Sequence, residues 1–336
     1  RVGDIGMMAF IGANLGSFYV NMGNVNKALQ LIEESVALDR KAGNLSQLYF
    51  SVGTLGWIYQ ILGEWDKSEQ CYAEALNFAQ RTKEFQGIAS GYFLPGWLDF
   101  EKGEYVRAKE LMEKGFEILE KAGAKYVTMS YIQFKIHTYI ELGEIEKAKN
   151  LVDDLQKYAL EKNDKQLIAN ADLVRAMLFR AQKKWEESIE YFEKCLQEFE
   201  ALDARHWNVY IFARYVLFEY ARVYLDRDQK GDREKAHNLL NQALEIFQKL
   251  GAKKDIEKTE SRIIYAETGR LVAPKPIPTA VSEKAPSLVS LGHPDLDNLL
   301  LGGIPQHYAV ILTSPSCDER DLVVKNFLEI GAKNGE

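Results

Sequence analysis

The chain has 336 residues, of which 46% are hydrophobic and 27% are charged, and its formal net charge is −7. This composition excludes a largely disordered polypeptide and is long enough for two domains or one elongated array. The negative charge argues against a general affinity for nucleic acid, whose phosphates need a basic surface.

Cysteine spacing and hydropathy indicate the cellular location of the protein. Cys71, Cys195 and Cys317 stand far apart with no CxxC pairing, which argues against a disulfide framework and against a zinc site. The most apolar helical stretch, 209–225, is interrupted by charged residues, so we expect no membrane span, and no signal peptide is visible. These features predict a cytoplasmic protein.

A repeat of constant length organises most of the chain. Six similar blocks begin at Gly23, Gly63, Gly103, Gly143, Lys183 and Gly231; the first five starts are 40 residues apart and the last lies 48 further on. Five positions after each start stands a small residue: Ala28, Ser68, Ala108, Ala148, Ser188 and Ala236. Such a residue lets a neighbouring helix approach closely, and the opening glycine can take the positive φ that reverses the chain. Apolar residues then recur at helical spacing, so each block predicts the second helix of one hairpin and the first helix of the next.

Two segments near the end of the array depart from the pattern. The fifth block contains an insertion, 201–230, that is long enough for an extended helix and a loop. The last predicted helix, near 253–269, is more polar, as expected for a terminal cap.

These residues resemble the tetratricopeptide repeat (TPR). Leu15-Gly16-x-x-Tyr19 followed by Gly23 and Ala28 matches its signature, as does Leu55-Gly56-x-x-Tyr59 followed by Gly63 and Ser68. The usual unit has 34 residues, so the 40-residue unit implies longer helices, as in variants found in regulatory ATPase-linked proteins. The resemblance implies an all-α, right-handed solenoid of antiparallel helix hairpins over residues 1–270.

The resemblance also implies a concave face lined by the first helix of each pair. Projecting the repeat by register places these residues there: Phe10, Phe50, Trp57, Phe93, Trp97, Phe100, Gln133, His137, Met177, Arg180 and Leu225. We expect this groove to bind an apolar peptide or an amphipathic helix of a partner protein. The alternative is that the aromatic residues serve in packing between repeats.

Residues 1–270 contain no catalytic pattern. His137 has no Cys or carboxylate partner at metal-ligand spacing, and carboxylate pairs such as Glu33-Glu34 fall on solvent faces of helices. We therefore predict a protein that is not an enzyme and that has no metal and no cofactor.

Composition changes abruptly after the array. Four of the eight prolines, Pro274, Pro276, Pro278 and Pro286, fall within residues 271–290. Proline lacks the amide proton and disfavours helix in the residue before it, so this segment is predicted to be an extended linker.

Residues 291–336 resemble the opening of a KaiC-type ATPase of the RecA superfamily, and so imply a short α/β fragment. Leu296-Asp297-x-Leu299-Leu300-x-Gly302-Gly303-Ile304-Pro305 matches its first part, and Phe327-Leu328-x-x-Gly331-Ala332 matches its last. The stretch "SPSCDERD" then falls on the phosphate loop G-x-x-x-x-G-K-[ST].

That loop is predicted to be degenerate. Ser314 and Glu319 replace the two glycines, Arg320 replaces the lysine, and Asp321 replaces the hydroxyl residue that ligates magnesium. The added carboxylates repel an anion at a helix N-terminus, and they can instead cap the helix that follows.

Two functional hypotheses follow from these features. The first is a non-catalytic scaffold or regulator that binds a protein or peptide in its concave face. The second is the sensor arm of a KaiC- or STAND-like signal-transduction ATPase whose working nucleotide site lies outside this chain. A third arrangement has residues 291–336 folded back onto the groove. Unpaired strands in that segment also predict self-association into a homo-oligomer.

Overall fold

The computed structural model describes residues 2–201, 208–270, 288–289 and 304–305. The chain divides into two units, residues 1–275 and 276–336, and each is considered by itself. The expected boundaries 1–270, 271–290 and 291–336 remain predictions.

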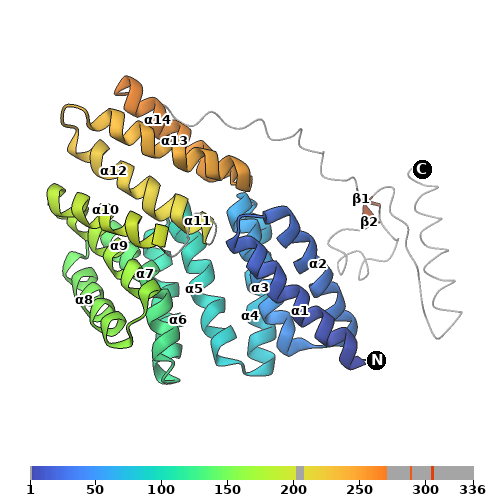
Figure 1. Ribbon diagram of the computed structural model, residues 1–336. Coiled ribbons are helices and arrows are strands. Elements are labelled where there is room, and N and C mark those ends of the chain that lie inside the picture. Colours follow the sequence, from blue (N-terminus) through green and yellow to red (C-terminus); the bar gives the residue numbers. More distant parts are fainter. Residues whose placement is uncertain (1, 202–207, 271–287, 290–303, 306–336) are drawn as a thin grey trace, which may run out of the picture. The chain divides into compact units, whose positions relative to one another are not determined.

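The first unit is a series of antiparallel helices, so the predicted all-α helical repeat solenoid is confirmed (Figure 1). Its helices are α1 (Val2–Asn21), α2 (Val25–Ala42), α3 (Leu45–Leu62), α4 (Trp65–Thr82), α5 (Phe85–Lys102), α6 (Tyr105–Lys121), α7 (Lys125–Glu141), α8 (Ile145–Lys162), α9 (Lys165–Ala181), α10 (Trp185–Ala201), α11 (Val209–Ile211), the π-helical η1 (Phe212–Leu217), α12 (Phe218–Arg227), α13 (Asp232–Leu250) and α14 (Lys253–Thr268).

Left-handed residues end these helices at a regular interval. Positive φ occurs at every twentieth position from 23 to 183, so the structural period is half of the sequence repeat. At Gly63 the backbone N–H groups of Gly63 and Glu64 donate to the carbonyl oxygens of Gln60 and Tyr59, at 3.0 and 2.9 Å. These bonds satisfy carbonyl groups that the helix end would otherwise leave without a partner.

Small residues set how closely the two helices of a pair approach. The six small residues predicted from the repeat are all fully buried. In the first helix of the pair, glycine has the same role: a Cβ at Gly16 would lie 2.5 Å from Ile32, and one at Gly56 would lie 2.7 Å from Tyr72. Larger side chains would force these helices apart.

The insertion forms a helical segment that runs through the interior of the unit. We call α11, η1 and α12 together the crossing segment (residues 209–227). All residues from Phe212 through Ala221 are buried, although two of them, Arg214 and Glu219, are charged. A helix that is buried all round is one that other helices cover on every side.

The end of the array also meets its beginning. Helix α14 contacts α3 and the turn that follows it: Lys253 Nζ lies 3.2 Å from Glu64 Oε1, and a Cβ at Gly63 would lie 2.9 Å from Lys254. The polar character predicted for α14 is confirmed, since only Asp255, Thr259 and Ala266 of this helix are buried.

In the second unit the structure describes one short pairing. Strands β1 (Leu288–Val289) and β2 (Ile304–Pro305) are antiparallel, with Leu288 opposite Pro305 and Val289 opposite Ile304. The predicted degenerate loop at Ser314, Glu319, Arg320 and Asp321 lies outside the described residues, as does most of the KaiC-like segment and of the linker.

The helix ends give a matched pair of stability predictions. Gly103 has φ 84° and open space where a Cβ would stand, whereas Lys83 occupies an equivalent position with φ 58°. We expect Gly103→Ala to lower the free energy of unfolding by about 1–2 kcal/mol through backbone strain, and Lys83→Gly to raise it by up to about 1 kcal/mol. Urea unfolding followed by circular dichroism measures both; a stabilising Gly103→Ala would contradict this role for the left-handed positions.

Candidate functional site

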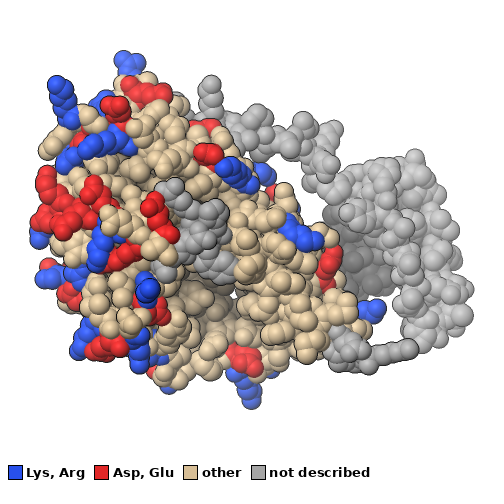
Figure 2. Space-filling view, viewed as in Figure 1, with Lys and Arg blue, Asp and Glu red and all other residues tan. Residues whose placement is uncertain are grey.

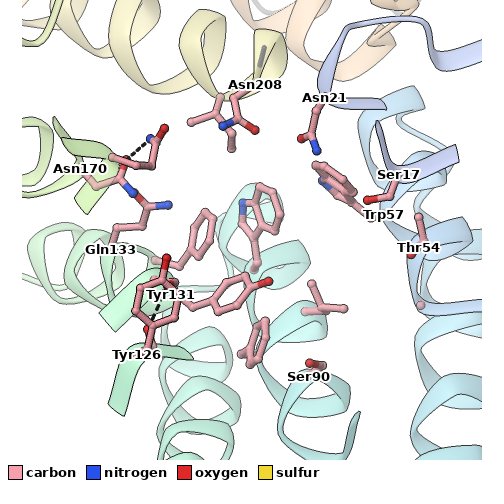
Figure 3. Close-up of a pocket in the computed structure, with 18 of the residues that line it drawn as sticks. Ser17, Asn21, Thr54, Trp57, Ser90, Tyr126, Tyr131, Gln133, Asn170 and Asn208 are labelled. Atoms are coloured by element: carbon pink, nitrogen blue, oxygen red, sulfur yellow. Dashed lines mark hydrogen bonds between the residues drawn. The ribbon is translucent and has the colours of Figure 1, made fainter. Parts of the chain in front are cut away.

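A cavity of about 440 Å³ lies on the concave side, among the first helices of the repeats and α11 (Figure 3). Its described lining residues are Ser17, Asn21, Tyr49, Phe50, Gly53, Thr54, Trp57, Ser90, Phe93, Leu94, Trp97, Tyr126, Ser130, Tyr131, Gln133, Phe134, Asp164, Gln166, Leu167, Asn170, Asn208 and Ile211. Helical spacing brings them together, because residues three or four apart on α3, α5 and α7 share one face.

Stacked aromatic rings form the apolar wall. The Trp97 ring lies 4.4 Å from Phe134 and 6.5 Å from Trp57, between ring centroids, and Phe93 lies 4.7 Å from Tyr131. Such rings offer a large apolar contact area that is held rigidly by its neighbours. The wall is therefore pre-formed.

Two polar atoms in the wall have no partner among the described residues. Trp57 Nε1 can only donate a hydrogen bond and Gln133 Oε1 can only accept one, and both atoms are buried and unpaired. Figure 3 shows Trp57 and Gln133 on opposite sides of the cavity, with Asn208 at its edge. Gln133 is only 8% exposed. A buried polar group without a partner costs about 1–3 kcal/mol, which a ligand with complementary groups would recover.

Charge is nearly absent from the part of the lining that the structure describes. Of the described lining residues, Asp164 is the one with a charged side chain, and it already accepts hydrogen bonds from Leu167 N at 3.0 Å and Tyr126 Oη at 3.3 Å. Gln166 Nε2 donates to Asn170 Oδ1 at 3.2 Å. The cavity thus presents amide and hydroxyl groups around an aromatic wall, and it suits an uncharged ligand.

Behind this wall lies a buried cluster of charges centred on the crossing segment. The Arg214 guanidinium lies 3.1 Å from Glu101 Oε2 on α5, 2.9 Å from Glu219 Oε1 and 3.5 Å from Asp255 Oδ1 on α14. Arg222 bridges Glu219, at 2.8 Å, and Glu141 of α7, at 3.0 Å. One arginine therefore connects three helices that are far apart in the sequence.

The cluster shifts the protonation of its own members. Burial opposes ionisation of Glu219, but the positive charges of Arg222, Arg180 and Arg214 outweigh it and lower the pKa of this carboxyl. Burial and the negative charge of Glu101 raise the pKa of Asp255 to about 6. Burial lowers the pKa of His137 to about 4.

The structure divides the residues predicted for the groove into three groups. Phe50, Trp57, Phe93 and Trp97 line the cavity together with Gln133. Phe10 is 49% exposed on α1 and is not part of the lining. The remaining members are buried and do not line it: Phe100, His137, Met177, Arg180 and Leu225.

The third group differs from the expectation of an open groove because the crossing segment fills that part of the concave face. The His137 ring lies 4.9 Å from the Tyr215 ring, and Arg180 forms an ion pair with Asp226 at 2.7 Å. These side chains contact the chain itself where a partner was expected.

Sequence reasoning also missed several lining residues. Tyr131 and Phe134 lie three positions apart on α7 and share a face of their own, so a stripe wider than the one that contains Gln133 would have found them. Asn170 lies on α9 at the register of a predicted face. Asn208 could not be found this way, because it belongs to the insertion, where the repeat gives no register.

Within the described residues, no helix is long and apolar enough to cross a membrane, and no group of three His, Cys, Asp or Glu side chains could hold a metal ion.

Removing the central cation of this cluster is expected to lower the free energy of unfolding strongly. We expect Arg214→Met to lower the free energy of unfolding by about 3–5 kcal/mol, because Glu101 and Glu219 would remain as buried, unpaired anions. The control is Arg40→Met, which breaks an ion pair with Glu74 at 2.8 Å where both side chains are well exposed, and should cost less than about 1 kcal/mol. Denaturant unfolding measures both variants. Equal losses of unfolding free energy would contradict the role of Arg214 as the centre of a buried charge cluster.

His137 predicts a specific pH dependence. Both ring nitrogens are unpaired, and the folded-state pKa of about 4 lies below the ordinary value of 6.5. The unfolded chain therefore binds more protons between pH 6.5 and 4, so this residue's contribution to stability is present above pH 6.5 and is lost as the pH falls. In His137→Phe we expect a smaller loss of unfolding free energy than in the wild type over this range, by about 2–3 kcal/mol. If the unfolding free energies of the two proteins fell equally as the pH was lowered, the burial of a neutral imidazole at position 137 would be contradicted.

Known proteins place this architecture in a family. The family described as "MalT-like TPR region" matches residues 4–262. The anaphase-promoting complex subunit CDC16 of Saccharomyces cerevisiae is 25% identical over 214 residues, which cover 54% of this chain and 24% of that protein, so the chain spans about a quarter of its length. Among solved structures, the fold is similar to a Rap protein complexed with Competence and Sporulation Factor, with a TM-score of 0.55 and 11% identity over 78% of this chain and 75% of that one. A tetratricopeptide repeat protein from Parabacteroides merdae ATCC 43184 gives a TM-score of 0.41 and 17% identity over 74% and 99%. Because the family match covers more than half of the chain, this protein belongs to the MalT-like TPR region family.

Proposed function

We propose that this chain is a non-catalytic recognition module that holds a short, uncharged stretch of a partner polypeptide in the concave cavity. TPR-type helical repeat proteins generally mediate protein–protein interactions, and the family match points to no catalytic class. A protein partner agrees with what is known of the similar proteins: one is a subunit of the anaphase-promoting complex, and the other forms a complex with Competence and Sporulation Factor.

The observation that carries the proposal is the pair of unpaired atoms in the wall. Each peptide unit carries one N–H donor and one C=O acceptor. An extended segment that crosses the cavity can give a carbonyl oxygen to Trp57 Nε1 and an N–H to Gln133 Oε1 once a side-chain rotation brings these two buried atoms to the cavity surface. Both atoms would then be satisfied, and apolar side chains of the segment would pack on the aromatic wall.

The two unpaired atoms favour an extended peptide over the amphipathic helix that was the other expected ligand. The backbone N–H and C=O groups of a helix are already bonded to one another, whereas those of an extended segment are free to pair with the wall. We therefore infer that a few extended residues enter the cavity.

Charge further restricts the segment. An acidic side chain would meet no described cation in the lining, and burying an unpaired charge is strongly unfavourable. A positive charge would have one carboxylate available, that of Asp164. The preferred segment is thus uncharged, and an amino group is tolerated only at the Asp164 end.

The second hypothesis, a sensor arm of a KaiC- or STAND-like ATPase, is supported by the MalT-like family match. The two hypotheses are compatible, because a sensor arm also needs a ligand-binding face. Calorimetry with ATP and magnesium tests the prediction of a degenerate loop: we expect no binding, and tight binding that is lost in Arg320→Ala would overturn it.

A random hexapeptide library, selected on the immobilised chain, tests the proposed function. We expect uncharged, apolar sequences to be enriched. For a selected peptide, Gln133→Leu and Trp57→Phe should each weaken binding about tenfold to a hundredfold in calorimetry, because each removes one hydrogen-bonding atom and leaves its partner unsatisfied.

Each control makes the same substitution at a residue that lies outside the cavity lining. Gln80→Leu on α4 and Trp185→Phe on α10 lie outside the lining and should bind the peptide as the wild type does. Enrichment of charged peptides, or equal affinity in all five proteins, would overturn the proposal.

A further inference from the structure

A continuous chain of hydrogen bonds and ion pairs leads from the cavity wall to α14, the last helix of the first unit. Trp97 presents its ring to the cavity, and its Nε1 donates to Tyr215 Oη at 2.7 Å. Tyr215 Oη in turn donates to Glu101 Oε1 at 2.7 Å. Arg214 then joins the other oxygen of Glu101, at 3.1 Å, to Asp255 Oδ1, at 3.5 Å.

Every member of this chain is buried. Trp97, Glu101, Arg214, Tyr215 and Asp255 are all less than one tenth exposed. Losing one member leaves its neighbours as buried polar groups without a partner. We therefore expect these contacts to form or break together. This differs from a set of independent surface contacts.

The docked position of α14 depends strongly on this series of hydrogen bonds and ion pairs. Asp255 is the one buried charged residue of α14, and the ion pair of Lys253 with Glu64, in the turn before α4, is open to solvent on its lysine side and so contributes little. Few buried apolar side chains hold α14 in place, which puts it among the elements that open most readily. A small change at Asp255 therefore has a large effect on its docking.

We propose that occupancy of the cavity and docking of α14 are energetically coupled through Trp97, Tyr215, Glu101, Arg214 and Asp255. The ligand side of this inference rests on the proposed function. A segment packed on the Trp97 ring gains its contacts only while the indole stays in the orientation that is bonded to Tyr215, and so favours the docked helix. By reciprocity the docked helix raises affinity for the segment by the same factor.

The coupling can be tested without any peptide, by hydrogen–deuterium exchange of the full chain. Trp97→Phe keeps an aromatic ring in the wall but deletes the donor at the start of the chain of contacts. We expect the exchange of α14 amides to rise at least fivefold, while exchange in α6 stays within twofold of the wild type. Tyr215→Phe, which removes the connecting hydroxyl, should give the same result and serves if Trp97→Phe folds poorly.

Two further variants make the test specific. Trp57→Phe makes the same chemical change in the same cavity, but its Nε1 has no partner, so exchange of α14 should not change. Asp255→Asn should raise α14 exchange, and its combination with Trp97→Phe should raise it no further than the larger single effect.

Three outcomes would overturn the coupling: unchanged α14 exchange in Trp97→Phe and Tyr215→Phe, an equal rise in every helix, or single effects that multiply in the double variant. Since no peptide is present, these outcomes are independent of the library selection, and either proposal can fail while the other stands.

Discussion

The buried guanidinium of Arg214 is the interaction on which the interior of this protein depends. It holds Glu101, Glu219 and Asp255, which lie on α5, α12 and α14, within ion-pairing distance. A charge in such a place is stable only when its partners are all present and well oriented. The π-helical turn η1, which contains Arg214, is the local irregularity that accompanies this arrangement.

This arrangement changes what the concave face can do. In a simple solenoid the first helices of the repeats would present one continuous groove. Here the crossing segment occupies the part of the face that contains His137 and Arg180, and the open part is the cavity lined from α1 to α9 and closed at α11. The molecule thereby separates two environments. Charges are paired in the buried cluster, while the described lining of the cavity consists of aromatic rings and, apart from Asp164, uncharged groups. On the visible surface, Figure 2 shows charged side chains gathered on the side of α8, α10 and α12–α14, whereas uncharged residues cover much of α1.

Sequence reasoning succeeded where the physical rule is local and repeated. Ala28 and its equivalents recur at a fixed spacing because every helix pair must solve the same packing problem, so one register predicts all of them. It failed where the deciding contact is unique and distant. Arg214 and Glu101 are 113 residues apart, and nothing periodic connects them. The charged residues of the crossing segment also look like those of a solvent-exposed helix until their partners are known. Gln133 was placed on the correct face by register, but its unpaired oxygen is a property of its surroundings and could not be inferred from the sequence.

The central claim is that the crossing segment is an integral part of the core and not a loop laid over an open groove. Amide hydrogen exchange of residues 212–221 in the wild-type chain tests it most directly, because buried core helices open only with global unfolding. The account predicts that these amides belong to the slowest-exchanging class, together with those of α5 and α7. Exchange as fast as that of α14 would show that the segment opens by itself, and would contradict the account.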